Sequence, residues 1–407
     1  MYIPRFIEKT ILEALKTFPV VILTGARQTG KTTLVKHLFK DTFTYLSLDE
    51  LDIRSLAINE PREFLARYRM PMIIDEIQNA PDLLPYIKSI IDNNRKNGMF
   101  IITGSQQFPL MRNVSESLAG RAAILNLYPF STSEITGNTS NRQKDILKYL
   151  KSSSVQEVPE KPKADLGTML LTGGYPGLYR NKEISKNLWF SSYIQTYIDR
   201  DIRGNIRNEN LTDFENFIRL LASRTAQELS YSAFSRDIGI SVPTIKSWVS
   251  LLQASSIIYL LKPYYKNFGK RLIKSPKLYF IDCGLAAYLT GIDTKEHLLK
   301  GPMAGPLFET FIVGNLLKRF SSLYSVPPLY YWKNIGGIEV DLIIEYGNVL
   351  IPIEIKLTTN ISGKHFGSLV KWVGYSGSGA DSIFFISNSP LKGRISQNIQ
   401  NINWYNL

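Results

Sequence analysis

The sequence contains very little cysteine and no long apolar stretch. Cys283 is the single cysteine among 407 residues, which excludes a disulfide framework and a metal site built from several cysteines. No run approaches the ~18 apolar residues that a membrane-spanning helix requires. The first segment spreads its charges and lacks the apolar core of a secretory signal. We therefore expect a cytoplasmic protein without a membrane partner.

Acidic residues are also few relative to basic ones. The sequence has 35 aspartates and glutamates and 48 lysines and arginines, which gives a net charge of +13. A basic excess favours polyanionic partners such as nucleic acid, although it also serves solubility alone. The length indicates roughly two to four domains, and a hydrophobic content of 44% is enough for several cores. DNA is therefore a candidate partner, depending on where the basic residues cluster.

The stretch VVILTGARQTGKTTLVKHLF predicts a buried strand, a glycine loop and a helix. The loop matches G-x-x-x-x-G-K-T, whose backbone N–H groups wrap a phosphate at the N-terminus of a helix. Lys31 is expected to reach the β- and γ-phosphates and Thr32 to offer its hydroxyl to Mg²⁺. The predicted nucleotide-binding residues are Gly25, Ala26, Arg27, Gln28, Thr29, Gly30, Lys31, Thr32 and Thr33.

Two acids follow the next predicted strand, in PMIIDEIQNAP. A carboxylate at the end of such a strand lies in the crevice where these sheets bind ligands. We expect Asp75 to hold Mg²⁺ through water and Glu76 to polarise the attacking water. The alternative, a solvated turn, is less favoured beside the glycine loop. A third strand ends in Thr103, Ser105 and Gln106, which either approach the γ-phosphate and water or simply cap the strand.

Arg121 follows a predicted helix end at Gly120 and precedes another strand. It is a candidate arginine finger, which would complete the site of a neighbouring subunit and so require a homo-oligomer. The alternative is a surface arginine. The predicted catalytic residues are therefore Lys31, Glu76 and Arg121.

The motifs GARQTGKTT, IIDEIQ, ITGSQQ, LAGR and PFSTSEI together resemble AAA-superfamily P-loop ATPases of a prokaryotic type. The resemblance covers roughly residues 1–135. It implies that the first motif binds ATP and that Asp75 and Glu76 are the metal-binding and catalytic acids. We expect an α/β domain with a P-loop parallel sheet at residues 1–137, using ATP and Mg²⁺ as cofactors.

Residues 138–210 predict a linker and a helical lid. The first part, residues 138–166, is polar and rich in serine, lysine and proline, which is typical of a linker around one short helix. A GGYP sequence at residues 173–176 resembles one that follows the core in the same ATPases; a tight turn explains it equally well.

Residues 211–277 predict a winged-helix-like domain. Gly239 suits the turn between two helices and Pro243 the first position of the second. A second helix of this kind would present Thr244, Lys246 and Ser247 to a major groove. The run KPYYKNFGKRLIKSPK, residues 262–277, carries six basic residues and no acid, which favours a phosphate-contacting wing. The alternative is a packing or protein-binding module.

Residues 278–407 end the chain, and there GIEVDLIIEYGNVLIPIEIKL predicts two strands joined by a hairpin at Gly347-Asn348. Alternation places Glu339 and Asp341 on one face and Glu354 and Lys356 on one face. If the two faces coincide, Asp341 and Glu354 can hold a divalent cation and Lys356 can steady a water or a phosphate. Glu309, from a preceding helix, is a second candidate for the same site.

The run D-x₁₂-E-x-K with a helical glutamate upstream resembles the PD-(D/E)XK nuclease-like fold. With SPKLYFIDCGLAA, it is also similar to the uncharacterised C-terminal domain that accompanies this type of ATPase. Val340 replaces the proline that gives the fold its name, which leaves cleavage open. The alternative is a polar strand face with cross-strand ion pairs, each worth only ~0.2–1 kcal/mol.

Three functions follow from these patterns. The leading hypothesis is a Mg²⁺-dependent ATPase that couples its nucleotide state to a DNA-binding or nuclease-like C-terminal half. The first alternative is an ATP-gated DNA-binding switch with little turnover. The second is an ATP-dependent, metal-dependent DNA endonuclease.

Overall fold

The computed structural model describes residues 2–104, 117–137, 146–155, 164–181, 183–197, 211–265, 274–323, 326–376, 383–391, 393–396 and 398–407. The chain forms two compact units. The N-terminal unit comprises Pro4–Pro129 and Ser250–Ile257, and the C-terminal unit comprises Met1–Ile3, Phe130–Val249 and Ile258–Leu407. None of the helices within the described residues has the length and apolarity needed to cross a membrane.

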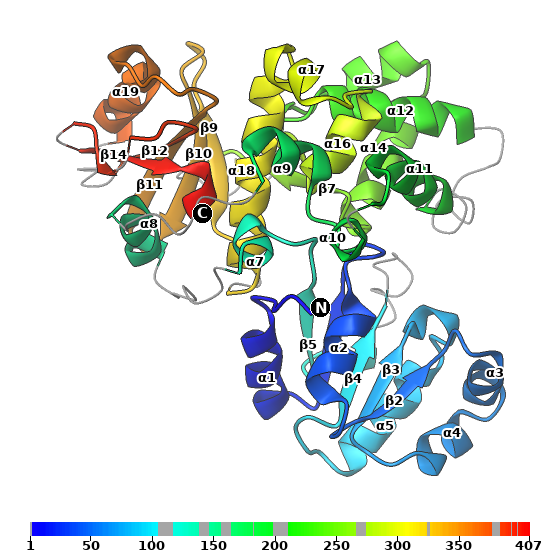
Figure 1. The fold of residues 1–407 in the computed structure, drawn as a ribbon. Coiled ribbons are helices and arrows are strands. Elements are labelled where there is room, and N and C mark those ends of the chain that lie inside the picture. The colour runs from blue at the N-terminus through cyan, green and yellow to red at the C-terminus, as the bar shows by residue number, and fades with distance from the viewer. Residues whose placement is uncertain are drawn as a thin grey trace. The chain divides into compact units, whose positions relative to one another are not determined.

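The N-terminal unit is built on a five-stranded sheet in the order β2-β3-β4-β1-β5 (Figure 1). Its strands are β1 (Val20–Thr24), β2 (Thr44–Ser47), β3 (Met72–Asp75), β4 (Phe100–Thr103) and β5 (Ala122–Asn126). Its helices are α1 (Glu8–Thr17), α2 (Lys31–Phe39), α3 (Leu51–Asn59), α4 (Pro61–Arg67), η1 (Ile77–Asn79) and α5 (Leu83–Asn93). Every neighbouring pair is parallel, which confirms the predicted parallel sheet.

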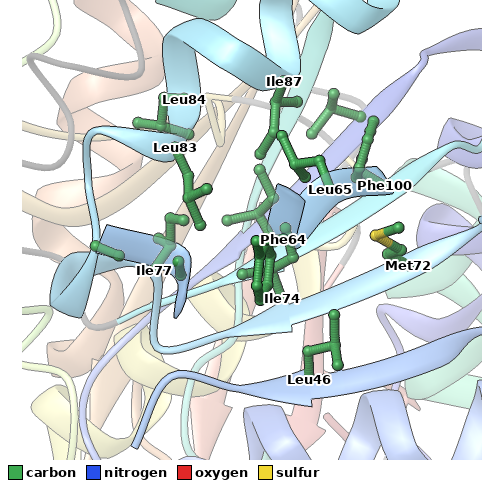
Figure 2. Packing of buried hydrophobic residues seen from close by; sticks show 14 of the residues in the cluster. Leu46, Phe64, Leu65, Met72, Ile74, Ile77, Leu83, Leu84, Ile87 and Phe100 are labelled. Carbon is green, nitrogen blue, oxygen red and sulfur yellow. The ribbon is translucent and has the colours of Figure 1, made fainter. Parts of the chain in front are cut away.

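The strand sequences explain this layering. Residues 20–24 and 72–75 are buried along their whole length, as expected of a parallel sheet covered on both faces. Figure 2 shows side chains of the sheet packed against those of α4, η1 and α5. The labelled core residues are Leu46, Met72, Ile74, Phe100, Phe64, Leu65, Ile77, Leu83, Leu84 and Ile87. Each such burial contributes about 1.5–3 kcal/mol, so this core fixes the sheet edge where the site residues gather.

The C-terminal unit begins with short helices and a small sheet. Its helices up to residue 300 are α7 (Thr132–Ile135), α8 (Ile146–Val155), α9 (Leu166–Thr172), α10 (Gly177–Arg180), α11 (Lys186–Tyr197), α12 (Leu211–Ser223), α13 (Tyr231–Ile238), α14 (Val242–Ala254), α16 (Cys283–Leu289) and α17 (Lys295–Lys300). The residues of α14 from Ser250 onward belong to the N-terminal unit. The strands β6 (Gln227–Glu228), β7 (Ile258–Leu261) and β8 (Lys277–Phe280) form an antiparallel sheet in the order β6-β8-β7.

The turn between α13 and α14 matches its prediction in part. Gly239 ends α13 with a left-handed φ of 80°, which a glycine adopts without strain. We expected Pro243 at the first position of the second helix, but α14 begins one residue earlier, at Val242. Pro243 therefore lies in the first turn of the helix, where a proline is tolerated.

The GGYP sequence forms a close packing contact. Gly173 has a φ of +65°, and a Cβ at this position would collide with the carboxylate of Asp282. Asp282 caps α16 by accepting a hydrogen bond from the Leu285 N–H at 3.0 Å and accepts another from the Gly174 N–H at 2.6 Å. These glycines therefore let α9 and α16 approach closely.

The end of the chain forms a six-stranded mixed sheet in the order β13-β14-β12-β11-β10-β9. The strands are β9 (Leu329–Lys333), β10 (Glu339–Tyr346), β11 (Val349–Lys356), β12 (Ile383–Ser387), β13 (Gly393–Arg394) and β14 (Ile399–Asn403). The helical segments are α18 (Ala304–Ser321), η4 (Gly363–Phe366), α19 (Gly367–Ser376) and η5 (Trp404–Asn406). Strands β10 and β11 form the predicted hairpin, since Tyr346 pairs with Val349.

Helices α18 and α19 position this sheet. Helix α18 packs against β8 and β11, and α19 packs against β10 and β11 (Figure 1). Trp372 of α19 lies in a buried cluster with Val340 and Ile343 of β10 and Phe385 of β12. Helices therefore cover β10 and β11, the two strands that carry the predicted acids, and Asp341 and Glu354 are buried.

Candidate functional site

The glycine loop lies at the carboxyl edge of the parallel sheet, between β1 and α2. Gly30 precedes α2 in a left-handed conformation, with φ 92° and ψ 25°. Gly25 has a φ of 138°, and a Cβ there would collide with the carbonyl oxygen of Leu127. Both motif glycines are thus required by the backbone geometry itself.

The loop is held by side chains that bond its carbonyl groups. Lys31 is buried and donates to the carbonyls of Gly25 at 2.9 Å and Ala26 at 3.0 Å. Thr29 also donates to the Ala26 carbonyl, at 2.9 Å. Buried Arg5 donates to the Thr29 carbonyl at 3.0 Å, a contact the sequence did not reveal. These contacts together bond the carbonyls of Gly25, Ala26 and Thr29.

The other predicted loop residues differ in exposure. Arg27 is half-buried, whereas Gln28, which has a φ of 60°, is exposed. Thr33 is exposed at the start of α2, while its neighbour Thr32 is half-buried and points to the end of β3.

The carboxylate of Asp75, at the end of β3, is surrounded by hydroxyl groups. Thr32 donates to its Oδ2 at 2.7 Å, Tyr45 donates to the same oxygen at 2.6 Å, and Thr103 donates to Oδ1. No lysine or arginine forms an ion pair with Asp75 within the described parts of the chain. Burial and the Asp75 carboxylate raise the pKa of Tyr45, so its phenol remains a donor. The hydrogen-bond donors to Asp75 among the described residues are thus neutral hydroxyl groups.

Glu76 adopts an unusual backbone conformation beside this carboxylate. Its φ of 61° and ψ of 47° lie in the left-handed region, which a non-glycine residue seldom occupies outside functional sites. Its N–H donates to the Thr103 hydroxyl at 3.4 Å, and its carboxylate accepts from the Gln78 amide. Thr103 therefore links both acids.

Hydroxyl and carboxylate oxygens are the ligands that Mg²⁺ prefers. Thr32 and Asp75 supply them side by side, and the glycine loop supplies backbone donors for phosphate. The residues present thus fit a nucleotide with Mg²⁺. Tyr45 was not anticipated, because a tyrosine in a short apolar strand carries no sequence signal for a site.

Arg121 is engaged within its own unit. Its Nε lies 2.6 Å from Asp92 Oδ1 and its Nη1 donates to the Ala119 carbonyl at 3.0 Å. The bond from Arg121 holds the pKa of Asp92 below its usual value. Ser105 and Gln106 lie outside the described residues.

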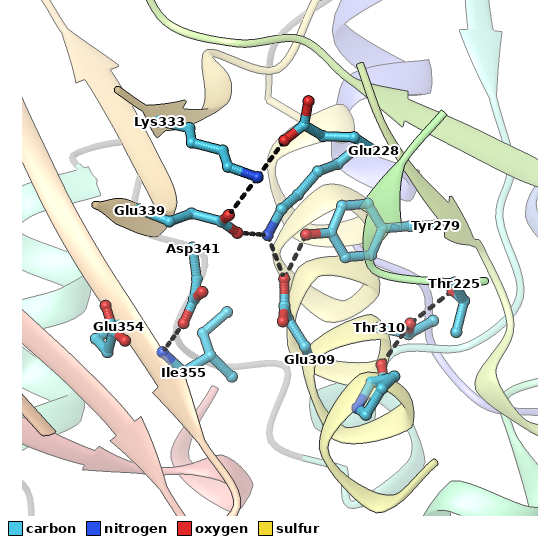
Figure 3. Close-up of polar contacts among 12 residues, drawn as sticks. Thr225, Glu228, Tyr279, Glu309, Thr310, Lys333, Glu339, Asp341, Glu354 and Ile355 are labelled. Atoms are coloured by element: carbon cyan, nitrogen blue, oxygen red, sulfur yellow. Dashed lines mark hydrogen bonds and ion pairs between the residues drawn. The ribbon is translucent and has the colours of Figure 1, made fainter. Parts of the chain in front are cut away.

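The acids of the C-terminal unit form a second polar cluster, shown in Figure 3, in which Asp341 and Glu354 are brought together. Lys356 lies 3.2 Å from Asp341 Oδ2 and 2.9 Å from Glu354 Oε1. The Ile355 N–H donates to Asp341 Oδ2 at 2.9 Å. The two predicted faces do coincide, and a lysine ammonium lies between the two acids.

Glu309 and Glu339 face a different lysine. Lys277 of β8 lies 3.2 Å from Glu309 Oε1 and forms an ion pair with Glu339. Tyr279 donates to Glu309 Oε1 at 2.6 Å. Lys277 is the last basic residue of the run predicted to contact phosphate, and for this residue the prediction is wrong: its side chain is 4% exposed, because β8 carries it into the acids.

Burial changes the protonation of this cluster. Burial and the charge of Asp341 raise the pKa of Glu309 to about 7 and that of Glu354 to about 8. Burial opposes the charges of Lys277 and Lys356, but the surrounding carboxylates outweigh it and raise both pKa values. Both lysines therefore remain charged.

The described residues contain no group of three or more histidine, cysteine, aspartate or glutamate side chains arranged to hold a metal ion. Asp341 and Glu354 are a pair, and Glu309 is bonded to Lys277 and Tyr279 instead. Glu354 Oε2 is buried and has no hydrogen-bond partner among the described atoms.

The candidate DNA-facing residues on α14 lie partly at the surface. Lys246 and Ser247 are exposed, and Thr244 is half-buried and bonded to Ser241 at 2.8 Å. Half of the predicted wing, residues 266–273, falls outside the described residues.

Comparisons with known proteins divide the chain into three stretches. Residues 17–136 match the AAA domain family, residues 163–296 match a domain of unknown function (DUF8612), and residues 304–400 match a domain of unknown function (DUF4143). An uncharacterized protein of Mycobacterium tuberculosis is 29% identical over 353 residues, 86% of this chain and 73% of that protein. An uncharacterized protein of Haemophilus influenzae is 21% identical over 322 residues, 74% of each.

Two solved structures are also similar to the chain. A Walker-type ATPase of Pyrococcus abyssi has a TM-score of 0.42 and 16% identity, covering 70% of this chain and 94% of its own. The RuvB Holliday junction branch migration motor of Thermotoga maritima has a TM-score of 0.30 and 16% identity, covering 62% and 88%. Residues 17–136 thus match the AAA domain family and contain the parallel sheet that carries the glycine loop, and residues 304–400 match a domain of unknown function.

Proposed function

We propose that the chain is a Mg²⁺-dependent ATPase that couples its nucleotide state to its C-terminal half. The observation that carries this proposal is the 2.7 Å hydrogen bond between Thr32 and Asp75 beside the glycine loop. It joins the two side chains expected to hold the metal ion at the N-terminus of α2, where a phosphate is stabilised by backbone donors and the helix dipole.

In this proposal each residue of the site has a separate role. Lys31 neutralises phosphate charge, and Glu76 orients the attacking water while Gln78 holds its carboxylate. Bound Mg²⁺ would supply charge stabilisation at the phosphates. Thr103 bonds both Asp75 and the Glu76 backbone, so it keeps the metal-holding and water-orienting acids in register. We further propose Arg121 as a finger acting on a neighbouring subunit, in which case its contact with Asp92 would have to open.

Hydrolysis and nucleotide binding of two variants test the proposal. Lys31→Ala should lose both activities, and Glu76→Gln should bind ATP but hydrolyse it roughly 10²–10³-fold more slowly. The exposed residues Lys40 and Glu63 provide matched controls, Lys40→Ala and Glu63→Gln, which should match the wild type. Unchanged rates in both Lys31→Ala and Glu76→Gln would refute the site. Tight binding with equally slow turnover in wild type and Glu76→Gln would indicate the ATP-gated switch instead.

We propose metal-dependent DNA cleavage as the second candidate function, with Asp341 and Glu354 as metal ligands. The buried Glu354 Oε2 without a partner among the described atoms favours it, because a buried carboxylate oxygen requires a donor or a cation. The order α18-β9-β10-β11-α19-β12, with Glu309 on the helix and Lys356 after Glu354, supports a nuclease-like fold. Both ligands are hard oxygen donors suited to Mg²⁺.

Plasmid cleavage tests the second function. Supercoiled DNA is incubated with Mg²⁺ or Mn²⁺ and with wild type, Asp341→Ala, Lys356→Ala or the exposed control Lys364→Ala. Cleavage should require both site residues and survive the control change. Absence of cleavage by the wild type, or its persistence in both site variants, would reject this function.

We also propose that α13, α14 and the β6-β8-β7 sheet form a winged-helix-like module that contacts DNA. The exposed Lys246 and Ser247 on α14 support it. Binding should weaken steeply with salt because lysine contacts release counterions. Lys246→Ala should reduce the salt slope by about one. Salt-independent binding, or none, would remove the module from this role.

A further inference from the structure

Lys277 is a buried cation at the start of β8, where a strand residue would ordinarily be apolar. Its side chain is 4% exposed and reaches Glu309 on α18 and Glu339 on β10. Figure 3 shows Glu309, Glu339 and Tyr279 converging from three elements. Lys277 is therefore shared by two carboxylates from different parts of the unit.

Among the described residues, the other partners of these carboxylates are a neutral hydroxyl and an exposed lysine. Tyr279 donates a neutral hydrogen bond to Glu309 at 2.6 Å. Lys333 lies 3.5 Å from Glu339 Oε2, but its side chain is 41% exposed and it also pairs with Glu228. Lys277 is thus the buried counter-charge at the point where Glu309 and Glu339 meet.

Glu309 and Glu339 are partly buried, with side chains 15% and 27% exposed, and carboxylates that lose solvent are stabilised by a positive charge or a proton nearby. A lysine ammonium and a divalent cation are alternative solutions to that requirement, since both bind carboxylate oxygens, and only one of them can occupy the same position. The ammonium group is covalently attached, so it is always present at this position at neutral pH.

We propose that Lys277 is a built-in counter-cation that keeps divalent metal ions away from Glu309 and Glu339. Removing its charge then creates a carboxylate site for a hard divalent cation of the Mg²⁺ or Mn²⁺ class. The proposal stands apart from ATP hydrolysis and DNA cleavage, because it concerns cation selectivity and not turnover.

Thermal unfolding of the full chain, without nucleotide, tests the proposal in EDTA and in increasing MnCl₂. Lys277→Met should unfold at a lower temperature than wild type in EDTA and recover with Mn²⁺, with a Tm rise about 5 °C larger than that of wild type. Lys333→Met removes the exposed partner of Glu339 and is the matched control, so its Mn²⁺ response should equal that of wild type.

Equal Mn²⁺ responses of Lys277→Met and wild type would overturn the proposal. Lys277→Met combined with Glu309→Gln removes one of the two carboxylates; this double variant should fold without Mn²⁺ and lose the additional response. A double variant that keeps the full response would also overturn the proposal. So would a Lys277→Met protein that stays insoluble at every Mn²⁺ concentration, since the cation is expected to replace the lost charge.

Discussion

The acids of the two units are buried in contrasting ways. Asp75 is surrounded by the hydroxyls of Thr32, Tyr45 and Thr103, whereas Asp341 and Glu354 share the ammonium of Lys356. Hydroxyl groups satisfy hydrogen bonds but leave the negative charge in place, and an ammonium group cancels it. Hydroxyl donors therefore leave a carboxylate open to a cation, as we propose for Asp75. A cation at Asp341 and Glu354 would have to displace the Lys356 ammonium.

The largest effect should come from removing the charge that the hydroxyls leave in place. Asp75→Asn keeps an acceptor for Thr32 and Tyr45 but weakens metal binding, so ATP hydrolysis should fall roughly 10²–10³-fold, several kcal/mol of transition-state stabilisation. Its Tm should change by a few °C at most, because no ion pair is broken. Steady-state hydrolysis and thermal unfolding measure both quantities, with exposed Asp52→Asn as the control. A large loss of Tm would contradict the contrast between the two units.

At Lys356, in contrast to Asp75, we expect a substitution to lower the stability of the fold. Lys356→Met leaves Asp341 and Glu354 without their shared ammonium, which should cost about 1–3 kcal/mol, less than for a fully buried pair because the lysine side chain is 43% exposed. Urea unfolding in EDTA measures the loss. Lys300→Met, at an exposed lysine paired with Glu296, should cost far less. Equal losses in the two variants would show that the Lys356 contacts add no stability.

The pH dependence of stability sharpens the comparison further. Burial and Asp341 raise the pKa of Glu354 from 4.5 to about 8. As the pH rises from 4.5 to 8, the unfolded chain loses this proton while the folded protein retains it, so stability is full at the lower end and falls toward the upper end. Glu354→Gln mimics the protonated acid, so the stability of this variant should decrease less than that of wild type as the pH rises. The Tm measured in EDTA between pH 5 and pH 8 tests this, and identical slopes would contradict it.

The smallest effect is expected from Tyr45→Phe. Removing the 2.6 Å bond to Asp75 Oδ2 leaves that oxygen with one fewer hydroxyl donor, so it becomes a better metal ligand. The Mg²⁺ concentration for half-maximal hydrolysis should fall about 2–5-fold, roughly the worth of one hydrogen bond. Tyr86→Phe, at a half-buried tyrosine of α5, is the matched control. A higher Mg²⁺ requirement in Tyr45→Phe would mean that the phenol assists the metal.

Local sequence signals predicted much of the fold and of the first site. The glycine loop and the acids after β3 are short-range patterns, so they indicated the parallel sheet and the meeting of Thr32 with Asp75. Strand alternation and the Gly347-Asn348 turn predicted the hairpin that brings Asp341, Glu354 and Lys356 together.

The missed residues are those that act across long sequence separations. Tyr45, Arg5 and Tyr279 each bond a partner far along the chain, and nothing in their own neighbourhoods marks them. Lys277 was counted with a basic run because sequence alone does not reveal that β8 turns that side chain into α18 and β10. Glu309 of α18 was expected beside Asp341 and Glu354. It bonds Lys277 and Tyr279, and the sequence does not reveal these two partners.

The solitary thiol of Cys283 gives the chain a ready-made reporter. It is buried at the start of α16, where its Sγ lies 3.9 Å from the Met169 carbonyl of α9, and burial raises its pKa. Because the chain has one cysteine, any alkylation observed must come from this position. The rate of maleimide labelling consequently measures how often α9 and α16 separate, with no mutagenesis and no background from other thiols.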